Sequence, residues 1–282
     1  MKIKFLLIIM TMLSLTACTT QNPSQTIAST TETLYENQSV IETTSVTETV
    51  PITAPETEYT APSLNIDPGA YPMKYEDAEN DSYMEYYVFI PENATQNMPL
   101  VIFLHGDGEV GRFAALENNT LMVRVREIYG DSFPFIVIAP CTRMESWVSW
   151  IIPDMLMNVI NEAVETYSID KDHIIITGHS RGAMGVWHMI NTHGDFFSAA
   201  VPVSCICWED INLETITKVP IRAFCGTWED YERWYSNLMR KQIEEIALAG
   251  GDAEFTLLEG ASHIQTPALS YTEELFQWML SQ

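Results

Sequence analysis

The residues best suited to chemistry lie in Gly178-His179-Ser180-Arg181-Gly182, which has the pattern G-x-S-x-G. The β-branched run 173–177 before it predicts a strand, and the residues after it predict a helix. The two glycines would let strand and helix pack closely around Ser180. The serine hydroxyl would then lie at a helix N-terminus, where the helix dipole favours developing negative charge. These features indicate a nucleophilic serine, with an ordinary turn between strand and helix as the alternative.

The elements that must position this serine alternate along the chain. The apolar run 100–104 predicts a strand covered on both faces, and residues 154–167 have the apolar spacing of a helix. Further strands are expected at 83–90, 135–139, 173–177, 199–203, 221–224 and 255–258, with helices after Gly182 and at 234–248 and 272–280. Alternating strands and helices imply βαβ crossovers and a mostly parallel sheet.

A second motif follows the strand at 100–104 and reads His105-Gly106-Asp107-Gly108-Glu109. Together with G-x-S-x-G in this order, it resembles the α/β-hydrolase superfamily. Within that superfamily, the chain is similar to the secreted esterase and prolyl-oligopeptidase-like (dienelactone hydrolase-like) branch. The resemblance covers most of residues 70–282. It implies an α/β-hydrolase fold, with a mostly parallel central sheet and helices on both faces.

The resemblance also implies an oxyanion hole, the pair of backbone donors that stabilises a tetrahedral intermediate. Its donors would be the N–H of Asp107, with Gly106 as neighbour, and the N–H of Arg181. Two preorganised donors are needed because negative charge develops on the carbonyl oxygen. Taken without Ser180, the first motif would indicate only a tight loop.

A general base is expected late in the chain, after the last strand. His263 is the only histidine beyond His193, and it directly follows the strand at 255–258. Its position after the nucleophile has the expected order, so His263 is the predicted base. His105 and His179 are expected to be structural neighbours of the site.

The third catalytic residue should follow the strand at 221–224. Members of the resembled family often have His-Gly-x-x-Asp there, whereas this chain has Cys225 in place of that histidine. Glu229 occupies the acid position, and Asp230 comes next. Spacing favours Glu229 and residue type favours Asp230, with Glu232 as a further candidate if the loop is longer. Any of these carboxylates could orient His263.

Aromatic residues after the strand at 135–139 could contact a substrate. Trp147 and Trp150, together with Trp208, are candidates for the lining of a cleft, since aromatic faces suit sugar rings or aryl groups. Packing against the edge of the core is the alternative role.

The N-terminal 62 residues differ from the rest of the chain. Residues 1–18 have a positively charged start and a short apolar run that ends in Leu15-Thr16-Ala17-Cys18. This pattern is typical of a signal peptide and resembles the bacterial lipobox, which would place lipid on Cys18. Residues 19–62 are rich in Thr, Glu and Ser and have no Lys or Arg, so they predict a disordered tether. Residues 63–282 form the expected catalytic domain.

Composition excludes some partners. The 282 residues carry 38 Asp and Glu against 14 Lys and Arg, a net charge of −24, which disfavours binding to nucleic acid. No metal-binding spacing, phosphate-binding loop or dinucleotide motif is present, so neither a metal nor a cofactor is expected. Contact with a membrane is expected only through the lipid anchor.

These observations predict a serine esterase outside the cell, acting on small-molecule or carbohydrate-linked esters. A peptidase or an acyltransferase with the same triad is an alternative, because the nucleophile does not select the leaving group. An inactive surface-binding protein is a second alternative, favoured only by the irregular acid loop.

Overall fold

A computed structural model describes residues 64–143, 146–149, 151–229 and 234–282. The predicted signal peptide and tether, with Cys18, lie outside these residues. Within the described part, no helix is both long and apolar enough to cross a membrane.

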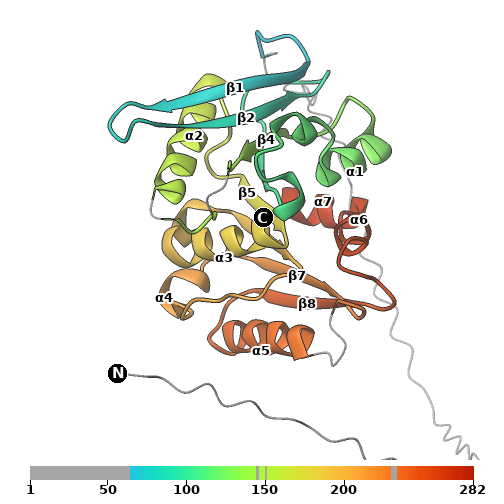
Figure 1. Cartoon of the computed structure of the whole chain (residues 1–282). Helices are drawn as coiled ribbons and strands as arrows, with labels where there is room; N and C mark the ends of the chain where they lie inside the picture. Colours follow the sequence, from blue (N-terminus) through green and yellow to red (C-terminus); the bar gives the residue numbers. More distant parts are fainter. Residues whose placement is uncertain (1–63, 144–145, 150, 230–233) are drawn as a thin grey trace, which may run out of the picture. The chain divides into compact units, whose positions relative to one another are not determined.

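An eight-stranded sheet in the order β1-β2-β4-β3-β5-β6-β7-β8 forms the centre of the fold (Figure 1). β1 pairs with β2, and β2 with β4, in antiparallel fashion, whereas every other neighbouring pair is parallel. The strands are β1 (Gly69–Asp77), β2 (Ser82–Ile90), β3 (Leu100–Leu104), β4 (Ile136–Cys141), β5 (Ile174–His179), β6 (Ala199–Val203), β7 (Ile221–Gly226) and β8 (Ala253–Leu258). The prediction of an α/β-hydrolase fold is confirmed.

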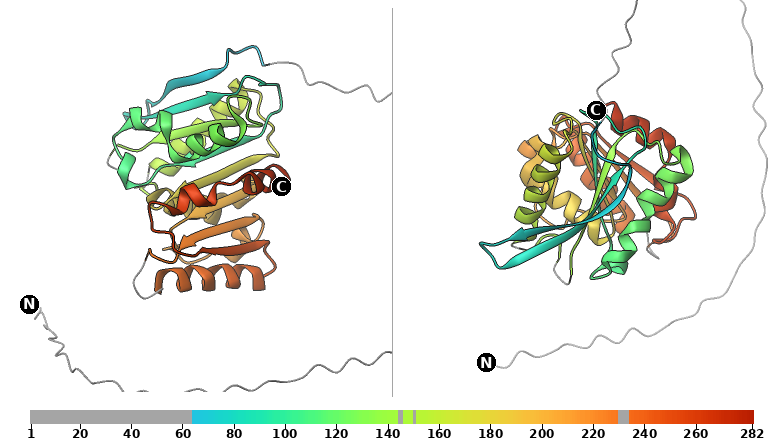
Figure 2. Two further views of the ribbon diagram at one scale, coloured as in Figure 1. Left: turned by 90° about the vertical axis from the view of Figure 1, so that its right-hand side faces the viewer. Right: turned by 90° about the horizontal axis from the view of Figure 1, so that it is seen from above.

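Helices cover both faces of this sheet (Figure 2). The α-helices are α1 (Thr120–Tyr129), α2 (Ile152–Thr166), α3 (Arg181–His193), α4 (Leu213–Ile216), α5 (Trp234–Leu248), α6 (Thr266–Ser270) and α7 (Glu273–Leu280). Three short 3-10 helices are η1 (Asp107–Glu109), η2 (Phe113–Asn118) and η3 (Gly194–Phe196). α2, α3 and α5 lie on one face, and α1 and α7 lie on the other.

The core consists of two apolar clusters, one on each face. In β3, Leu100, Ile102 and Leu104 belong to the cluster with α2 and α3, while Val101 and Phe103 belong to the cluster with α1 and α7. Side chains alternate across a strand, so a strand buried on both faces must be apolar throughout. All five residues of β3 are buried.

The sequence analysis missed β1, α1, the short helices α4 and α6, and the three 3-10 helices. β1 is an edge strand whose residues alternate between half-buried and exposed, and it contains Pro72. α1 buries Leu121, Met122 and Val125, and Ile128 and Tyr129 pack against the same cluster, which is a helical spacing that the sequence analysis did not use. Its N-terminus is capped by Asn119, whose side chain accepts a hydrogen bond from the Met122 N–H at 3.0 Å.

The register of the parallel strands brings the predicted motifs to one edge. Leu104, the last residue of β3, pairs with Gly178 of β5, and His179 pairs with Val203 of β6. Gly226 of β7 pairs with Leu258 of β8. The loops after β3, β5, β6, β7 and β8 therefore all begin at the carboxyl edge of the sheet, where such folds bind their ligands.

Candidate active site

Ser180 occupies a strained turn between β5 and α3. Its φ of 56° and ψ of −118° lie where non-glycine residues are rare, and such positions cost about 1–3 kcal/mol. The Ser180 N–H donates to the Val203 carbonyl at 2.9 Å, which ties the turn to β6. This backbone is the geometry that the G-x-S-x-G pattern predicts for an exposed nucleophile.

The two flanking glycines are required by close backbone contacts. A Cβ on Gly182 would lie 1.8 Å from the Leu104 carbonyl oxygen, and one on Gly178 would lie 2.6 Å from the Gly182 carbonyl carbon. Neither neighbour is a flexible side chain that could move aside. The pattern therefore reflects the steric demands of packing α3 against the ends of β3 and β5.

His263 and Glu229 come together from different loops. The His263 Nδ1 lies 2.7 Å from the Glu229 Oε2, and both residues line a cleft that also contains Ser180. The Glu229 side chain is 2% exposed, whereas that of His263 is 45% exposed. Glu229 is thus in contact with His263, and the other two candidate acids, Asp230 and Glu232, lie outside the described residues.

The second oxygen of Glu229 has three hydrogen-bond donors of its own. Its Oε1 accepts from the Ser204 hydroxyl at 2.6 Å, the Thr266 hydroxyl at 2.5 Å and the Gly226 N–H at 2.6 Å. Burial by itself raises the pKa of Glu229, but these bonds, with the one from His263, hold that pKa below its ordinary value. The carboxylate is therefore ionised at neutral pH, with Oε2 directed at His263.

This arrangement determines the tautomer of the base. Because an ionised carboxylate can only accept, Nδ1 of His263 must carry a proton, and the neutral ring then has its lone pair on Nε2. Sequence reasoning missed Ser204 and Thr266, since single Ser and Thr residues after a strand or at the start of a helix carry no distinguishing signal.

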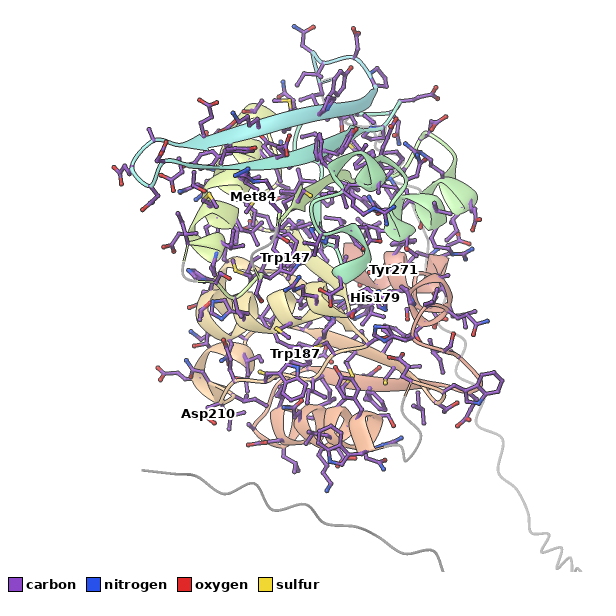
Figure 3. The ribbon with its side chains drawn as sticks, in the orientation of Figure 1. Met84, Trp147, His179, Trp187, Asp210 and Tyr271 are labelled. Atoms are coloured by element: carbon purple, nitrogen blue, oxygen red, sulfur yellow. The ribbon has the colours of Figure 1, made fainter. Side chains whose placement is uncertain are left out.

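His179, labelled in Figure 3, directly precedes Ser180 in the chain and contacts His263. Its Nε2 lies 2.9 Å from the carbonyl oxygen of His263, and the two imidazole rings are 4.6 Å apart. Burial lowers the pKa of His179 to about 4, and the charge of His263 acts in the same direction. His179 is therefore neutral near pH 7 and, because the carbonyl can only accept, donates its proton to the loop that carries His263.

His105 is fully buried and links the ends of β3 and β4. Its Nε2 accepts from the Thr142 N–H at 3.0 Å, so its proton lies on Nδ1, which donates to the Gly106 carbonyl at 2.7 Å. Burial lowers the pKa of His105 to about 4. The neutral ring holds the loop that begins at Gly106.

The buried His105 should make stability depend on pH. Below the ordinary histidine pKa of 6.5, His105 is protonated in the unfolded chain. In the folded protein it stays neutral until the pH falls to about 4. The free energy of unfolding should therefore fall as the pH falls through this window. His105 contributes up to about 1.4 kcal/mol per pH unit, and His179, whose pKa is also lowered to about 4, adds to the slope. Urea unfolding at pH 7, 6 and 5 measures the slope. His105→Asn should reduce it and His193→Asn should not, whereas an unchanged slope in His105→Asn contradicts this assignment.

Trp147 does not line the cleft, which corrects the prediction. It is 1% exposed, its indole N–H donates to the His105 carbonyl at 3.0 Å, and its ring lies edge-on to that of His105 at 5.0 Å. A Cβ on Gly185 would lie 2.7 Å from the Trp147 Cβ, so the ring packs tightly against α3. Trp147 thus supports the site from the core. Trp150 lies outside the described residues.

Asp107 and Arg181, the two residues expected to supply the oxyanion hole, line the same cleft as Ser180. A Cβ on Gly106 would lie 3.5 Å from the Ser180 Cβ, so the loop after β3 passes close to the serine. Arg181 begins α3 and Asp107 begins η1, and the first N–H groups of a helix have no acceptor within it. Their side chains form an ion pair at 2.8 Å. Both segments are thus joined beside the serine.

The cleft has a volume of about 690 Å³. Besides Asp107, Arg181 and the three residues Ser180, Glu229 and His263, its lining comprises Ser146, Met184, Ser204, Cys205, Trp208, Trp234 and Tyr235. Acyl transfer requires a nucleophile, a base with a carboxylate partner, and backbone donors around one open space, and residue types able to take each of these roles line this cleft.

Comparison with known proteins relates part of the chain to serine hydrolases. Residues 145–242 match the profile of the prolyl oligopeptidase family. Acetylxylan esterase A of Emericella nidulans is 24% identical over 165 residues, covering 52% of each chain. A bifunctional acetylxylan esterase/xylanase of Neocallimastix patriciarum is 25% identical over 135 residues, covering 45% of this chain and 18% of the relative. The chain thus spans about half the length, or less, of these curated relatives.

Solved structures share the fold. A thermostable esterase superposes with a TM-score of 0.62 at 24% identity, covering 76% of this chain and 63% of the esterase. Acetyl xylan esterase from Aspergillus awamori superposes with a TM-score of 0.57 at 16% identity, covering 74% of this chain and 98% of that one. At these identities, the structures establish the α/β-hydrolase fold alone.

Proposed function

We propose that this protein is a serine esterase, which hydrolyses carboxylic esters through a Ser180–His263–Glu229 triad. The observation that carries the proposal is the 2.7 Å contact between His263 and a buried, multiply bonded Glu229, in the cleft that contains the strained Ser180. A carboxylate that sets the tautomer of a histidine beside an exposed serine is the arrangement that activates a hydroxyl nucleophile.

The reaction proceeds through an acyl-enzyme. Nε2 of His263 takes the proton of Ser180 as its Oγ bonds to the ester carbonyl carbon, and Glu229 stabilises the imidazolium that forms. The N–H groups of Asp107 and Arg181 bind the oxyanion. The intermediate collapses as His263 gives its proton to the departing alkoxide. In the second half-reaction His263 takes a proton from a water molecule whose oxygen bonds to the acyl carbon. The bond between this carbon and the Ser180 Oγ then breaks as His263 returns the proton to Oγ, which releases the carboxylic acid.

Carbohydrate-linked esters are the substrate class that we favour. Acetylxylan esterases recur among the relatives and among the structures with this fold. A location outside the cell fits such polymeric substrates. We further propose that residues 1–18 are a lipoprotein signal, that lipid on Cys18 anchors the protein, and that residues 19–62 tether the domain to the membrane.

A peptidase is the second candidate, favoured by the match of residues 145–242 to the prolyl oligopeptidase family. This segment contains Ser180 and Glu229, so the match supports the nucleophile chemistry whichever leaving group is used. Assays on a peptide amide and on an ester of the same acyl group distinguish the two candidates. Faster release from the amide would favour the peptidase.

A fluorophosphonate probe tests the serine chemistry directly. The folded wild-type protein should be labelled on Ser180 and should hydrolyse p-nitrophenyl acetate. Absence of both labelling and hydrolysis would instead support a surface-binding protein that has lost catalysis. Labelling at another serine would overturn the assignment of the nucleophile.

Deletion of residues 19–62, with the signal and Cys18 retained, should leave the rate on a soluble ester within about twofold of wild type. The reason is that this tract has no apolar period with which to dock on the catalytic domain. Measuring kcat/KM and the thermal midpoint of both proteins tests the prediction. A large fall in the thermal midpoint would show that the tract packs against the domain.

A further inference from the structure

The loop after β6, residues 204–209, is held in place by side chains of α5. The Gln242 amide accepts from the Cys207 N–H at 3.1 Å and donates to the Cys207 carbonyl at 2.7 Å. The Tyr235 hydroxyl accepts from the Ile206 N–H at 3.2 Å and donates to the Ser204 carbonyl at 3.3 Å. Two side chains of one helix thus satisfy four backbone groups of this loop.

The opposite side of the same loop is bonded to α3. The indole N–H of Trp187, a fully buried residue, donates to the Cys205 carbonyl at 2.7 Å (Figure 3). The His188 Nδ1 lies 2.8 Å from a carboxylate oxygen of Glu209. The loop is therefore fixed from both flanks, and a side chain that it carries is held at a defined place relative to Ser180.

That loop presents an exposed tryptophan to the cleft. Trp208 is 58% exposed and lines the same space as Ser180 and His263. Trp234, at the start of α5, is 59% exposed and also lines it. The ring of Tyr235 lies 6.5 Å from that of Trp208 and 6.3 Å from that of Trp234. We call Trp208, Trp234 and Tyr235 the aromatic wall.

Packing does not account for these exposed indoles. Large aromatic side chains usually bury most of their surface, as Trp147 and Trp187 do at 1% exposure each. Two indoles that remain largely exposed at the mouth of a cleft form an apolar patch of the kind that marks a binding surface. A rigid loop reduces the entropy lost when a ligand orders such a side chain.

We infer that the aromatic wall is a ring-binding subsite, which receives a substrate ring that presents an apolar face and thereby determines substrate preference. This inference rests on the proposed esterase function. The ring can belong to either part of the ester, as a sugar in the alcohol or an aryl group in the acid. Both present a flat C–H or π face that stacks on indole and are bound by the same surface.

Binding to an inactive protein tests the subsite without using the reaction. In the Ser180→Ala background, calorimetry measures the affinity for acetylated xylotriose, the sugar arm, and for methyl 4-hydroxycinnamate, the aryl arm. Adding Trp208→Ala should weaken binding in at least one arm about tenfold, equivalent to about 1.4 kcal/mol. Trp208→Phe, which keeps a ring, should lose less than threefold. The compound whose affinity falls shows whether the ring belongs to the alcohol, as a sugar, or to the acid, as an aryl group.

Trp228 provides the matched control. It is 73% exposed and follows β7 at the same edge of the sheet, but it does not line the cleft. Trp228→Ala should therefore leave both affinities within twofold. Failure of both compounds to bind, no effect of Trp208→Ala, or an equal loss in Trp228→Ala would each overturn the inference.

A kinetic measurement separates this inference from the proposed function. With Ser180 present, Trp208→Ala should lower kcat/KM on ring-bearing esters about fivefold more than on triacetin, a ring-free ester, whereas Trp228→Ala should leave kcat/KM on both within about twofold. Parallel losses on triacetin and on ring-bearing esters would mean that Trp208 supports the structure of the site, which would overturn the subsite. No hydrolysis of triacetin by the wild-type protein would contradict the esterase proposal, while the calorimetric result would still decide the subsite.

Discussion

Replacing Ser180 with alanine is expected to lower kcat on a soluble ester by about 10³-fold or more, because the change removes the Oγ that forms the acyl-enzyme. The fold should be unaffected. The N–H to Val203 is a backbone bond that alanine retains, and alanine is subject to the same strain at a φ of 56° as serine. Initial rates on p-nitrophenyl acetate, with circular dichroism and thermal unfolding of both proteins, measure the effect.

A conservative change elsewhere provides the control. Ser132→Ala removes the hydroxyl of an exposed serine that contacts Glu92 at 3.4 Å, in the segment before β4. It should retain the wild-type rate. A Ser180→Ala protein that is folded and hydrolyses the ester at the wild-type rate would eliminate Ser180 as the nucleophile.

Replacing Glu229 with glutamine is expected to cut kcat by up to about 10⁴-fold, the loss known for the best-studied triad acid. A neutral amide cannot stabilise the imidazolium. Its NH₂ group can also donate to Nδ1 of His263, which would move the ring proton to Nε2, where the lone pair is needed. Rates are measured on the same soluble ester as for wild type.

Asp230→Asn is the matched comparison, since it makes the same chemical change one residue along the chain. It should change the rate little, because the Glu229 carboxylate already contacts His263 and accepts three further hydrogen bonds. The reverse pattern would assign the role to Asp230. Near-wild-type rates for both variants would exclude both carboxylates, and Glu232 would then be tested in the same way.

Local signals in the sequence were sufficient for much of the fold. Strands covered on both faces are apolar throughout, so the predicted strands at 100–104 and 199–203 coincide with β3 and β6. β1 escaped detection because none of its residues is fully buried: one face only half-buries Tyr71, Met73 and Tyr75 against the core. α1 has an apolar spacing typical of a helix, but the sequence analysis assigned no element to it.

The tryptophans show that residue type alone does not predict which side chains line the cleft. Trp147 and Trp208 have the same side chain, and both follow strands that end at the same edge of the sheet. One is buried against His105 and Gly185, while the other is exposed in the cleft. Which tryptophan is packed and which is presented depends on the neighbours supplied by α3 and α5, and no local pattern records these neighbours.

The sequence by itself determined the fold class and identified Ser180 and His263 as candidate catalytic residues. The glycines that the turn requires lie next to Ser180 in the sequence, and the position of His263 after the last strand can be read from the order of motifs along the chain. The choice of Glu229 as the partner of His263 came only from the tertiary structure. The Glu229 carboxylate accepts hydrogen bonds from donors at the ends of β6 and β7 and in α6. These donors are separated by up to 62 residues in the chain. A carboxylate can be buried and ionised only where such donors converge, and their convergence is a property of the folded sheet.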